Sequence, residues 1–72
     1  MNGKKLLIAR MLQADVSKRE LAEKLGIRIE TFRIKLNTNG WKCNEILLLI
    51  DILGLSRDDV MNIFFYKNST NK

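Results

Sequence analysis

The chain has 72 residues, with 13 Lys and Arg against 8 Asp and Glu, and it contains no proline and no histidine. This length predicts one small domain, and the lack of proline favours helices throughout. Its one cysteine, Cys43, excludes an internal disulfide framework, so we expect a reduced, cytoplasmic setting. Without histidine and with a single cysteine there is no ligand set for zinc and no His-based catalytic relay, so we expect no metal and no cofactor.

The first helix is predicted over residues 4–14. The apolar stretch before Arg10 is too short for a signal peptide or a membrane span. The side chains spaced i, i+1, i+4 and i+5 are expected to face the core, namely Leu7, Ile8, Met11 and Leu12. The basic residues of this helix, Lys4, Lys5 and Arg10, are expected to stay in water, with a DNA phosphate as the alternative partner of Lys4 or Lys5.

Two short helices joined at a glycine are predicted between residues 18 and 37. Ser17 and Glu20 have the spacing of a capping box, which predicts that the first of them begins at residue 18. Gly26 follows the last periodic apolar residue and suits a left-handed turn. The second helix is expected over residues 28–37.

The inward stripe of helix 28–37 is narrow, because only Phe32 and Leu36 are apolar at core spacing. A polar turn then ends this helix. Trp41, which follows the turn, is expected to pack under the loop and not to stack on a base.

A fourth helix is predicted over residues 45–53 and is apolar on almost every side. One side suits the core and consists of Ile46, Leu49, Ile50 and Leu53. The other side carries Leu47 and Leu48, and exposed apolar residues of this kind indicate a protein contact. The alternative is that the C-terminal tail buries the two leucines.

The fifth helix opens with a second capping-box pattern, formed by Ser56 and Asp59. Its inward side is expected to be Val60, Ile63 and Phe64. The domain is predicted to end at residue 66, and the polar tail 67–72 is predicted to be disordered.

The spacing of Ala22, Gly26 and Phe32 resembles the helix-turn-helix of the lambda-repressor-like, Cro and Xre family of DNA-binding proteins, phage type. In that motif a small residue lets the helices cross closely, a glycine makes the turn and an apolar residue fills the angle. The likeness covers roughly residues 6–65. It implies an all-α fold: a compact five-helix lambda-repressor-like domain whose second and third helices form the motif.

The resemblance also implies a function. The chain is expected to be a sequence-specific regulator of transcription, Cro- or repressor-like, that inserts helix 28–37 into the major groove of double-stranded DNA. It is expected to act as a homodimer on a two-fold operator and to be cytoplasmic and nucleoid-associated, with no membrane or small-molecule substrate.

By match to the family, the positions nearest the bases are Arg28, Ile29, Glu30, Arg33 and Ile34. The candidates for phosphate contact are Lys18, Lys35, Asn37, Asn39 and Lys42. The dimer interface is expected to contain Leu47, Leu48, Phe65 and Tyr66. The family more often has polar residues at the two isoleucine positions. Either this chain reads thymine-rich steps by apolar contact, or Ile29 is partly core and the helix is rotated from the family norm.

The distribution of charge agrees with a nucleic-acid partner. Residues 1–42 contain ten Lys and Arg against four Asp and Glu, a net +6, whereas residues 43–72 contain three against four, a net −1. Basic side chains near phosphates release counterions and so add affinity, although a solvated surface is the alternative interpretation of the same charges.

Two other function classes are alternatives to a DNA-binding regulator. The first is an adaptor that keeps the fold and binds a protein through the apolar side of helix 45–53. The second is an enzyme, which we disfavour because the sequence shows no paired carboxylates, no nucleophile with a base and no phosphate-cradling loop.

Overall fold

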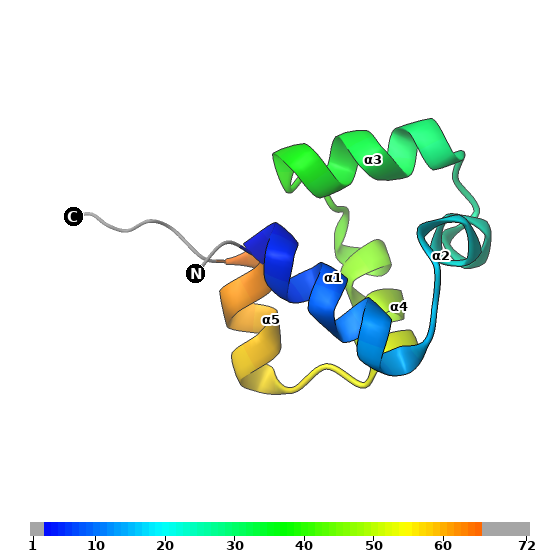
Figure 1. The fold of residues 1–72 in the computed structure, drawn as a ribbon. Helices are drawn as coiled ribbons and strands as arrows, with labels where there is room; N and C mark the ends of the chain where they lie inside the picture. Colours follow the sequence, from blue (N-terminus) through cyan, green and yellow to red (C-terminus); the bar gives the residue numbers. More distant parts are fainter. Residues whose placement is uncertain (1–2, 66–72) are drawn as a thin grey trace.

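The computed structural model describes residues 3–65, which form five α-helices and no strand (Figure 1). The helices are α1 (Gly3–Ala14), α2 (Lys18–Leu25), α3 (Ile29–Thr38), α4 (Cys43–Leu53) and α5 (Arg57–Phe64). The prediction of an all-α domain of five helices is confirmed. The predicted domain end at residue 66 and the predicted tail 67–72 lie outside the described residues. Within residues 3–65, none of the helices is long and apolar enough to cross a membrane.

The ends of α2 follow from local chemistry. Ser17 Oγ accepts a hydrogen bond from the Glu20 backbone at 3.0 Å, and a Glu20 carboxylate oxygen accepts one from the Ser17 backbone at 2.8 Å. Gly26 ends the helix with φ at +74°, in the left-handed region. A Cβ at this glycine would meet nothing within 4 Å, so the turn requires glycine for its backbone conformation and not for space.

The core is one cluster of side chains contributed by all five helices and by the α4–α5 connection. Its buried members are Leu7, Met11, Leu21, Ala22, Phe32, Leu36, Leu49, Leu53, Leu55, Ile63 and Phe64. The predicted inward sides of α4 and α5 are confirmed, because their remaining members, Ile46, Ile50 and Val60, pack against this cluster while partly buried.

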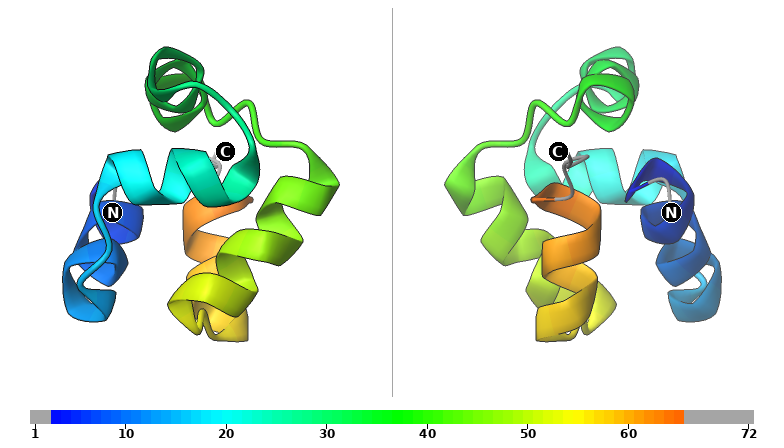
Figure 2. Two further views of the ribbon diagram at one scale, coloured as in Figure 1. Left: turned by 90° about the vertical axis from the view of Figure 1, so that its right-hand side faces the viewer. Right: turned by 90° about the vertical axis from the view of Figure 1, so that its left-hand side faces the viewer.

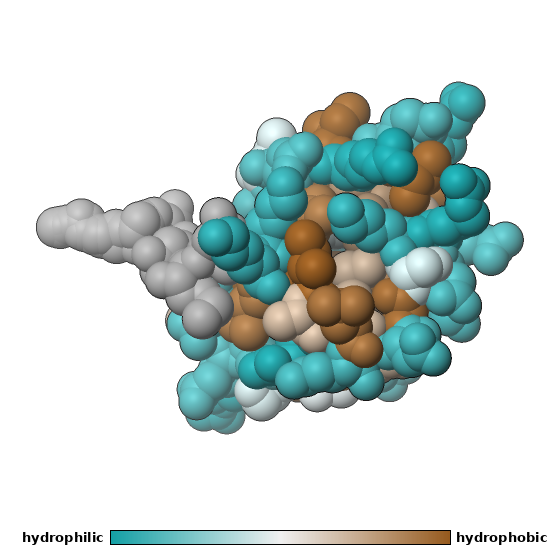
Figure 3. Space-filling view, in the orientation of Figure 1, coloured by the Kyte–Doolittle hydropathy of each residue, from teal (hydrophilic) through white to brown (hydrophobic). Residues whose placement is uncertain are grey.

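The inward side of α1 differs from the prediction. The sequence pattern predicts Leu12 in the core, but 77% of its surface is exposed. The helix packs mainly against α5, and a Cβ at Gly3 would lie 2.5 Å from the Ile63 backbone oxygen. The side of α1 that faces the core therefore runs through Gly3 and the buried residues Leu7 and Met11, and Leu12 is turned outward. Apolar side chains accordingly gather over α1 in Figure 3.

Arg10 also differs from the prediction, because it faces α5 and not water. It forms a bidentate ion pair with Asp59, with Nε to Oδ2 at 2.9 Å and Nη2 to Oδ1 at 2.8 Å. Asp59 also accepts a hydrogen bond from the Ser56 backbone, and Ser56 Oγ accepts one from the Asp59 backbone. The predicted capping box is therefore confirmed, and its carboxylate additionally ties α5 to α1.

The ion pair between Arg10 and Asp59 should make the thermal stability of the fold depend on pH in the acid range. The hydrogen bond from Arg10 is the largest cause that lowers the pKa of Asp59 to about 2, from an ordinary value of 3.8. A carboxylate with a depressed pKa stabilises the fold above its ordinary pKa, and this contribution is lost as the pH falls through the lowered value. We therefore expect wild type to melt above Asp59→Asn at pH 7, and the difference to shrink between about pH 4 and pH 2.

Thermal melts followed by circular dichroism measure this difference. The asparagine can still accept a hydrogen bond from the Ser56 backbone, so the cap is kept, while the charge and one of the two hydrogen bonds from Arg10 are lost. Asp58→Asn, an exposed neighbour in the same helical turn, is the matched control and should change the melting temperature less. A wild-type advantage over Asp59→Asn that stays constant from pH 7 to pH 2 would contradict the assignment.

Candidate nucleic-acid interface

The helix α3 lies across one end of the molecule, beside α2 and clear of the other helices on its outer side (Figures 1 and 2). Only Phe32 and Leu36 of this helix are buried. Trp41 supports it from the following loop, packing edge to face against Phe32 with ring centroids 5.4 Å apart and against Phe64 at 6.4 Å. The prediction that Trp41 packs under the loop is confirmed.

The outer face of α3 is open to solvent. Its exposed members include Arg28, Glu30, Arg33, Ile34 and Asn37. The helix begins at Ile29, one residue later than predicted, so Arg28 is its N-cap with extended backbone and no side-chain cap. Arg28 and Glu30 approach each other at 4.0 Å, but their side chains are 88% and 70% exposed, so this pair holds neither side chain strongly.

The two isoleucines of α3 have different surroundings. Ile29 is partly buried and packs against the core, whereas 62% of Ile34 is exposed. Helical spacing explains the difference, because residues 29, 32 and 36 share the inner face and residue 34 lies nearly opposite residue 32. Of the two interpretations of Ile29, partial burial in the core is the observed one.

The predicted phosphate contacts divide into two groups. Lys18 and Lys42 are exposed at the first position of α2 and at the N-cap of α4. Lys35 is instead turned into the protein, because its ammonium lies 3.0 Å from Glu45 Oε1 and its side chain is only 14% exposed. Asn39 donates a hydrogen bond from its amide to the Phe64 backbone oxygen at 2.8 Å. Lys35 is predicted among the exposed phosphate contacts, but its ammonium is turned towards α4 and away from the exposed face of α3.

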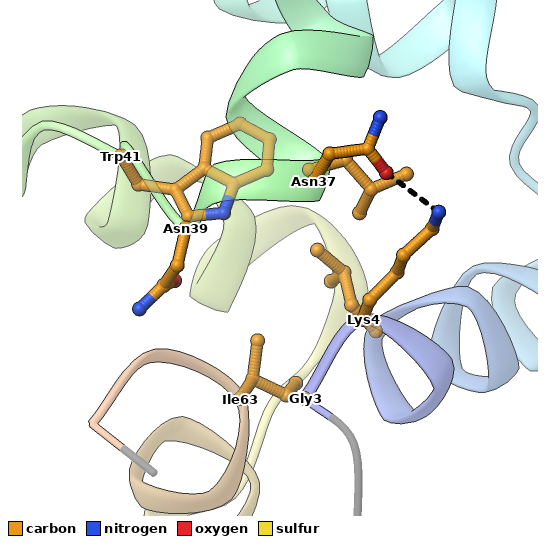
Figure 4. Close-up of a pocket in the computed structure, with 8 residues that line it drawn as sticks. Gly3, Lys4, Asn37, Asn39, Trp41 and Ile63 are labelled. Carbon is orange, nitrogen blue, oxygen red and sulfur yellow. Dashed lines mark hydrogen bonds between the residues drawn. The ribbon is translucent and has the colours of Figure 1, made fainter. Parts of the chain in front are cut away.

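A cavity of about 130 Å³ lies where α1 begins and α3 ends. In Figure 4, Lys4 and Asn37 lie at its rim, and Lys4 Nζ donates a hydrogen bond to Asn37 Oδ1 at 2.6 Å. Leu7, Leu36 and Ile63 are among the apolar side chains that line it. The structure thus brings an ammonium group from α1 to the end of α3, a contact that the sequence pattern did not predict.

The start of α4 depends on Glu45. The helix begins at Cys43, two residues earlier than predicted, and Lys42 at its N-cap has no side-chain acceptor. Glu45, only 4% exposed, reaches back instead and accepts a hydrogen bond from the Lys42 backbone at 2.8 Å. Burial alone would raise the pKa of Glu45, but hydrogen bonds from Lys42 and Lys35 and their charges outweigh it and lower the pKa.

Sequence reasoning missed this role of Glu45, although a signal was present. It stands three residues after the N-cap, the position from which a glutamate reaches the N-cap backbone. Cys43, next to that N-cap, carries an exposed free thiol.

The expected dimer surface is exposed where it is described. Leu47 is 62% exposed, Leu48 40% and Phe65 55%. Tyr66, the fourth residue of this prediction, lies outside the described residues. Whether these side chains contact a second copy stays a prediction.

Comparison of the chain with protein-family models, with curated proteins and with solved structures found no significant match. Among residues 3–65, no group of three or more His, Cys, Asp and Glu side chains is placed to hold a metal ion. The interpretation of the α3 surface therefore depends on the geometry and chemistry of its own residues.

Proposed function

We propose that this protein is a sequence-specific, double-stranded DNA-binding regulator of transcription whose reading element is α3. One observation carries the proposal: only Phe32 and Leu36 of α3 are buried, and the helix lies at the edge of the domain with Arg33 and Ile34 exposed on its outer side. A helix with its side chains is roughly 10–12 Å wide, which matches a major groove about 12 Å wide. The resemblance of the motif to lambda-repressor-like, Cro and Xre proteins supports the same assignment.

The exposed side chains of α3 offer three kinds of base contact. Arg33, like Arg28 before the helix, can donate two hydrogen bonds to guanine. Glu30 can accept a hydrogen bond from the cytosine amino group, and Ile34 can contact a thymine methyl group. Ile29 is left out of this reading set because it packs against the core.

The surrounding charge suits the DNA backbone. Lys18 and Lys42 are exposed, and Lys4 reaches the end of α3 through Asn37. These residues belong to the part of the chain, residues 1–42, that carries a net +6. We assign to them the phosphate contacts that set affinity and register without reading sequence.

The working form in this proposal is a homodimer on a two-fold operator in the cytoplasm. One recognition helix covers too few base pairs to find a single site in a genome, and pairing two copies on adjacent half-sites removes this limit. Leu47 and Leu48 supply the apolar surface for the pairing, in the half of the chain where charges nearly cancel.

The second candidate function is a protein adaptor. It is favoured by the same two exposed leucines, which a protein partner of another kind would cover equally well. This candidate does not require the exposed face of α3 to contact anything.

Salt dependence separates the two functions. If phosphate contacts dominate, the logarithm of duplex affinity should fall linearly with the logarithm of salt concentration, by about 0.9 for each phosphate contacted. With roughly four to eight contacts per dimer, the expected slope is about −4 to −7. Fluorescence anisotropy with duplexes selected from a random pool measures it. Absence of binding to any duplex, or affinity that ignores salt, would favour the adaptor.

A further inference from the structure

The ion pair between Lys35 of α3 and Glu45 of α4 is the most buried of the three ion pairs within residues 3–65. Its side chains are 14% and 5% exposed, against 29% and 12% for Arg10 and Asp59. The nitrogen and oxygen lie 3.0 Å apart, across the loop that separates the two helices. The pair therefore joins the proposed reading helix to the helix that carries Leu47 and Leu48.

The same two residues hold the loop 39–42 at both ends. The Lys35 backbone oxygen accepts hydrogen bonds from the backbones of Asn39 and Gly40, and its ammonium approaches the Gly40 oxygen at 3.4 Å. The oxygen of Glu45 that binds Lys35 also accepts the hydrogen bond from the Lys42 backbone. The end of α3 and the start of α4 are thus fixed relative to each other by directional contacts.

Stability alone does not account for such a pair. The desolvation of a buried ammonium and carboxylate offsets much of their attraction, and apolar residues of similar volume are often as stable or more so. Apolar contacts are non-directional, whereas an ion pair with several hydrogen bonds favours one arrangement. Directional contacts of this kind restrict the angle between α3 and α4 more than an apolar pair of similar volume would.

We propose that Lys35 and Glu45 are positioning residues that set the spacing of the two reading helices in the dimer without touching DNA. This inference rests on the proposed function and on pairing through α4. Half-sites about 34 Å apart place each reading helix roughly 17 Å from the two-fold axis. A rotation of roughly 10° then moves it by about 3 Å, close to the rise of one base pair.

The double variant Lys35→Met with Glu45→Gln tests this role. Methionine approximates the length of lysine, and glutamine keeps an oxygen for the Lys42 backbone, so the ion pair is lost while the start of α4 stays capped. Circular dichroism, the emission of the single tryptophan, Trp41, and sedimentation should show a folded dimer. Affinity for an isolated half-site should change less than about threefold, because no DNA contact has been removed.

The distinguishing measurement uses duplexes whose two half-sites are moved one base pair closer together or further apart. Wild type should bind the duplex of selected spacing about tenfold or more tightly than the other two. A half-site displaced by one base pair presents the wrong bases to the reading helix, and its cost is expected to resemble that of a mismatched base pair. The double variant should bind the three spacings nearly equally and should lose about tenfold on the selected one. Arg10→Met with Asp59→Asn removes the ion pair between α1 and α5, so as a matched control it should keep the spacing preference.

A second variant keeps the charge. Lys35→Arg places a larger cation against Glu45, so it should stay folded and shift or broaden the preferred spacing. An unchanged spacing preference in both variants would overturn the inference while leaving the proposed function intact. Unfolding of the double variant would also overturn it, because the pair would then be needed for stability. Failure of wild type to bind duplex DNA would remove the proposed function itself, and this inference with it.

Discussion

Leu48→Glu is expected to leave a folded, helical monomer that has lost tight binding to a two-half-site operator. Leu48 is 40% exposed, so a glutamate can remain in water in the monomer, whereas two copies pressed together would bury it without a partner. Linking two binding modules raises affinity by about 10²- to 10⁴-fold, and this gain disappears when the modules separate. We therefore expect operator affinity to fall towards that of one half-site.

The exposed side of α4 suits packing against a copy of itself. Asn44, Leu47, Leu48 and Asp51 are all exposed and spaced i, i+3, i+4 and i+7, so they form one stripe. A two-fold axis between residues 47 and 48 would set two α4 helices antiparallel, with Leu47 of each copy against Leu48 of the other. Asp51 would then lie near the N-terminus of the other α4, where a carboxylate is favoured.

Leu12→Glu is the matched control, because Leu12 is an exposed leucine on α1 and not on α4. It should leave both the dimer and operator binding unchanged. Sedimentation equilibrium gives the oligomeric state, circular dichroism gives the helicity, and anisotropy gives the affinity. If the tail covers Leu48 instead, Leu48→Glu should unfold the domain. A folded Leu48→Glu protein that still dimerises at micromolar concentration would show that the interface lies elsewhere.

Arg33→Ala is expected to lower affinity for the selected operator by roughly 1–3 kcal/mol per half-site and to change binding to random DNA little. Arg33 is exposed on the outer face of α3, so its removal should not disturb the fold. Lys42→Ala should weaken binding to operator and to random DNA alike, because a phosphate contact carries no sequence information. It should also make the salt slope shallower by about 1 per half-site.

Arg57→Ala controls for the loss of one positive charge. Arg57 is exposed at the start of α5, in the part of the chain whose charges nearly cancel, and it should affect neither kind of binding. Anisotropy titrations on operator and on random duplexes at one salt concentration compare the variants. Similar losses for Arg33→Ala on both duplexes would remove Arg33 from the reading set.

The helix ends that sequence reasoning predicted correctly depend on chemistry within a few residues. Ser17, Gly26 and Ser56 each act on backbone groups of near neighbours, so their spacing in the sequence is sufficient evidence. The sequence pattern places the start of α4 too late, because the N-cap residue Lys42 offers no acceptor and the cap is made by Glu45, which reaches back to the Lys42 backbone.

The errors concern helix rotation and distant partners. The apolar pattern of α1 is compatible with two neighbouring inward stripes, and only the packing of α1 on α5 decides between them. The sequence therefore predicts Leu12 inside and Arg10 outside, whereas the structure has Leu12 exposed and Arg10 facing α5. Arg10 meets Asp59, 49 positions later, and no local pattern indicates that contact. Lys35 is predicted at the surface from its helical position. The error arises because its partner, Glu45, lies on another helix ten positions away, and no local pattern indicates this contact.

For the candidate site, the spacing within α3 predicted correctly that Arg33 and Ile34 lie on the open face. It left Ile29 undecided, because a residue at the edge of a stripe is covered or uncovered according to the shape of its neighbours. The roles of these side chains at DNA stay predictions.

The exposed thiol of Cys43 gives the chain one chemical handle at the start of α4. In the antiparallel pairing described above, residue 43 of each copy lies 4.5 positions from the two-fold axis, so the two thiols are roughly 13 Å apart along the helices. With helix axes 8–10 Å apart, their separation is about 16 Å. That distance is far beyond disulfide bonding, so an oxidised, covalently linked species would join copies from different dimers, whereas paired spin labels on this cysteine would report directly on the dimer.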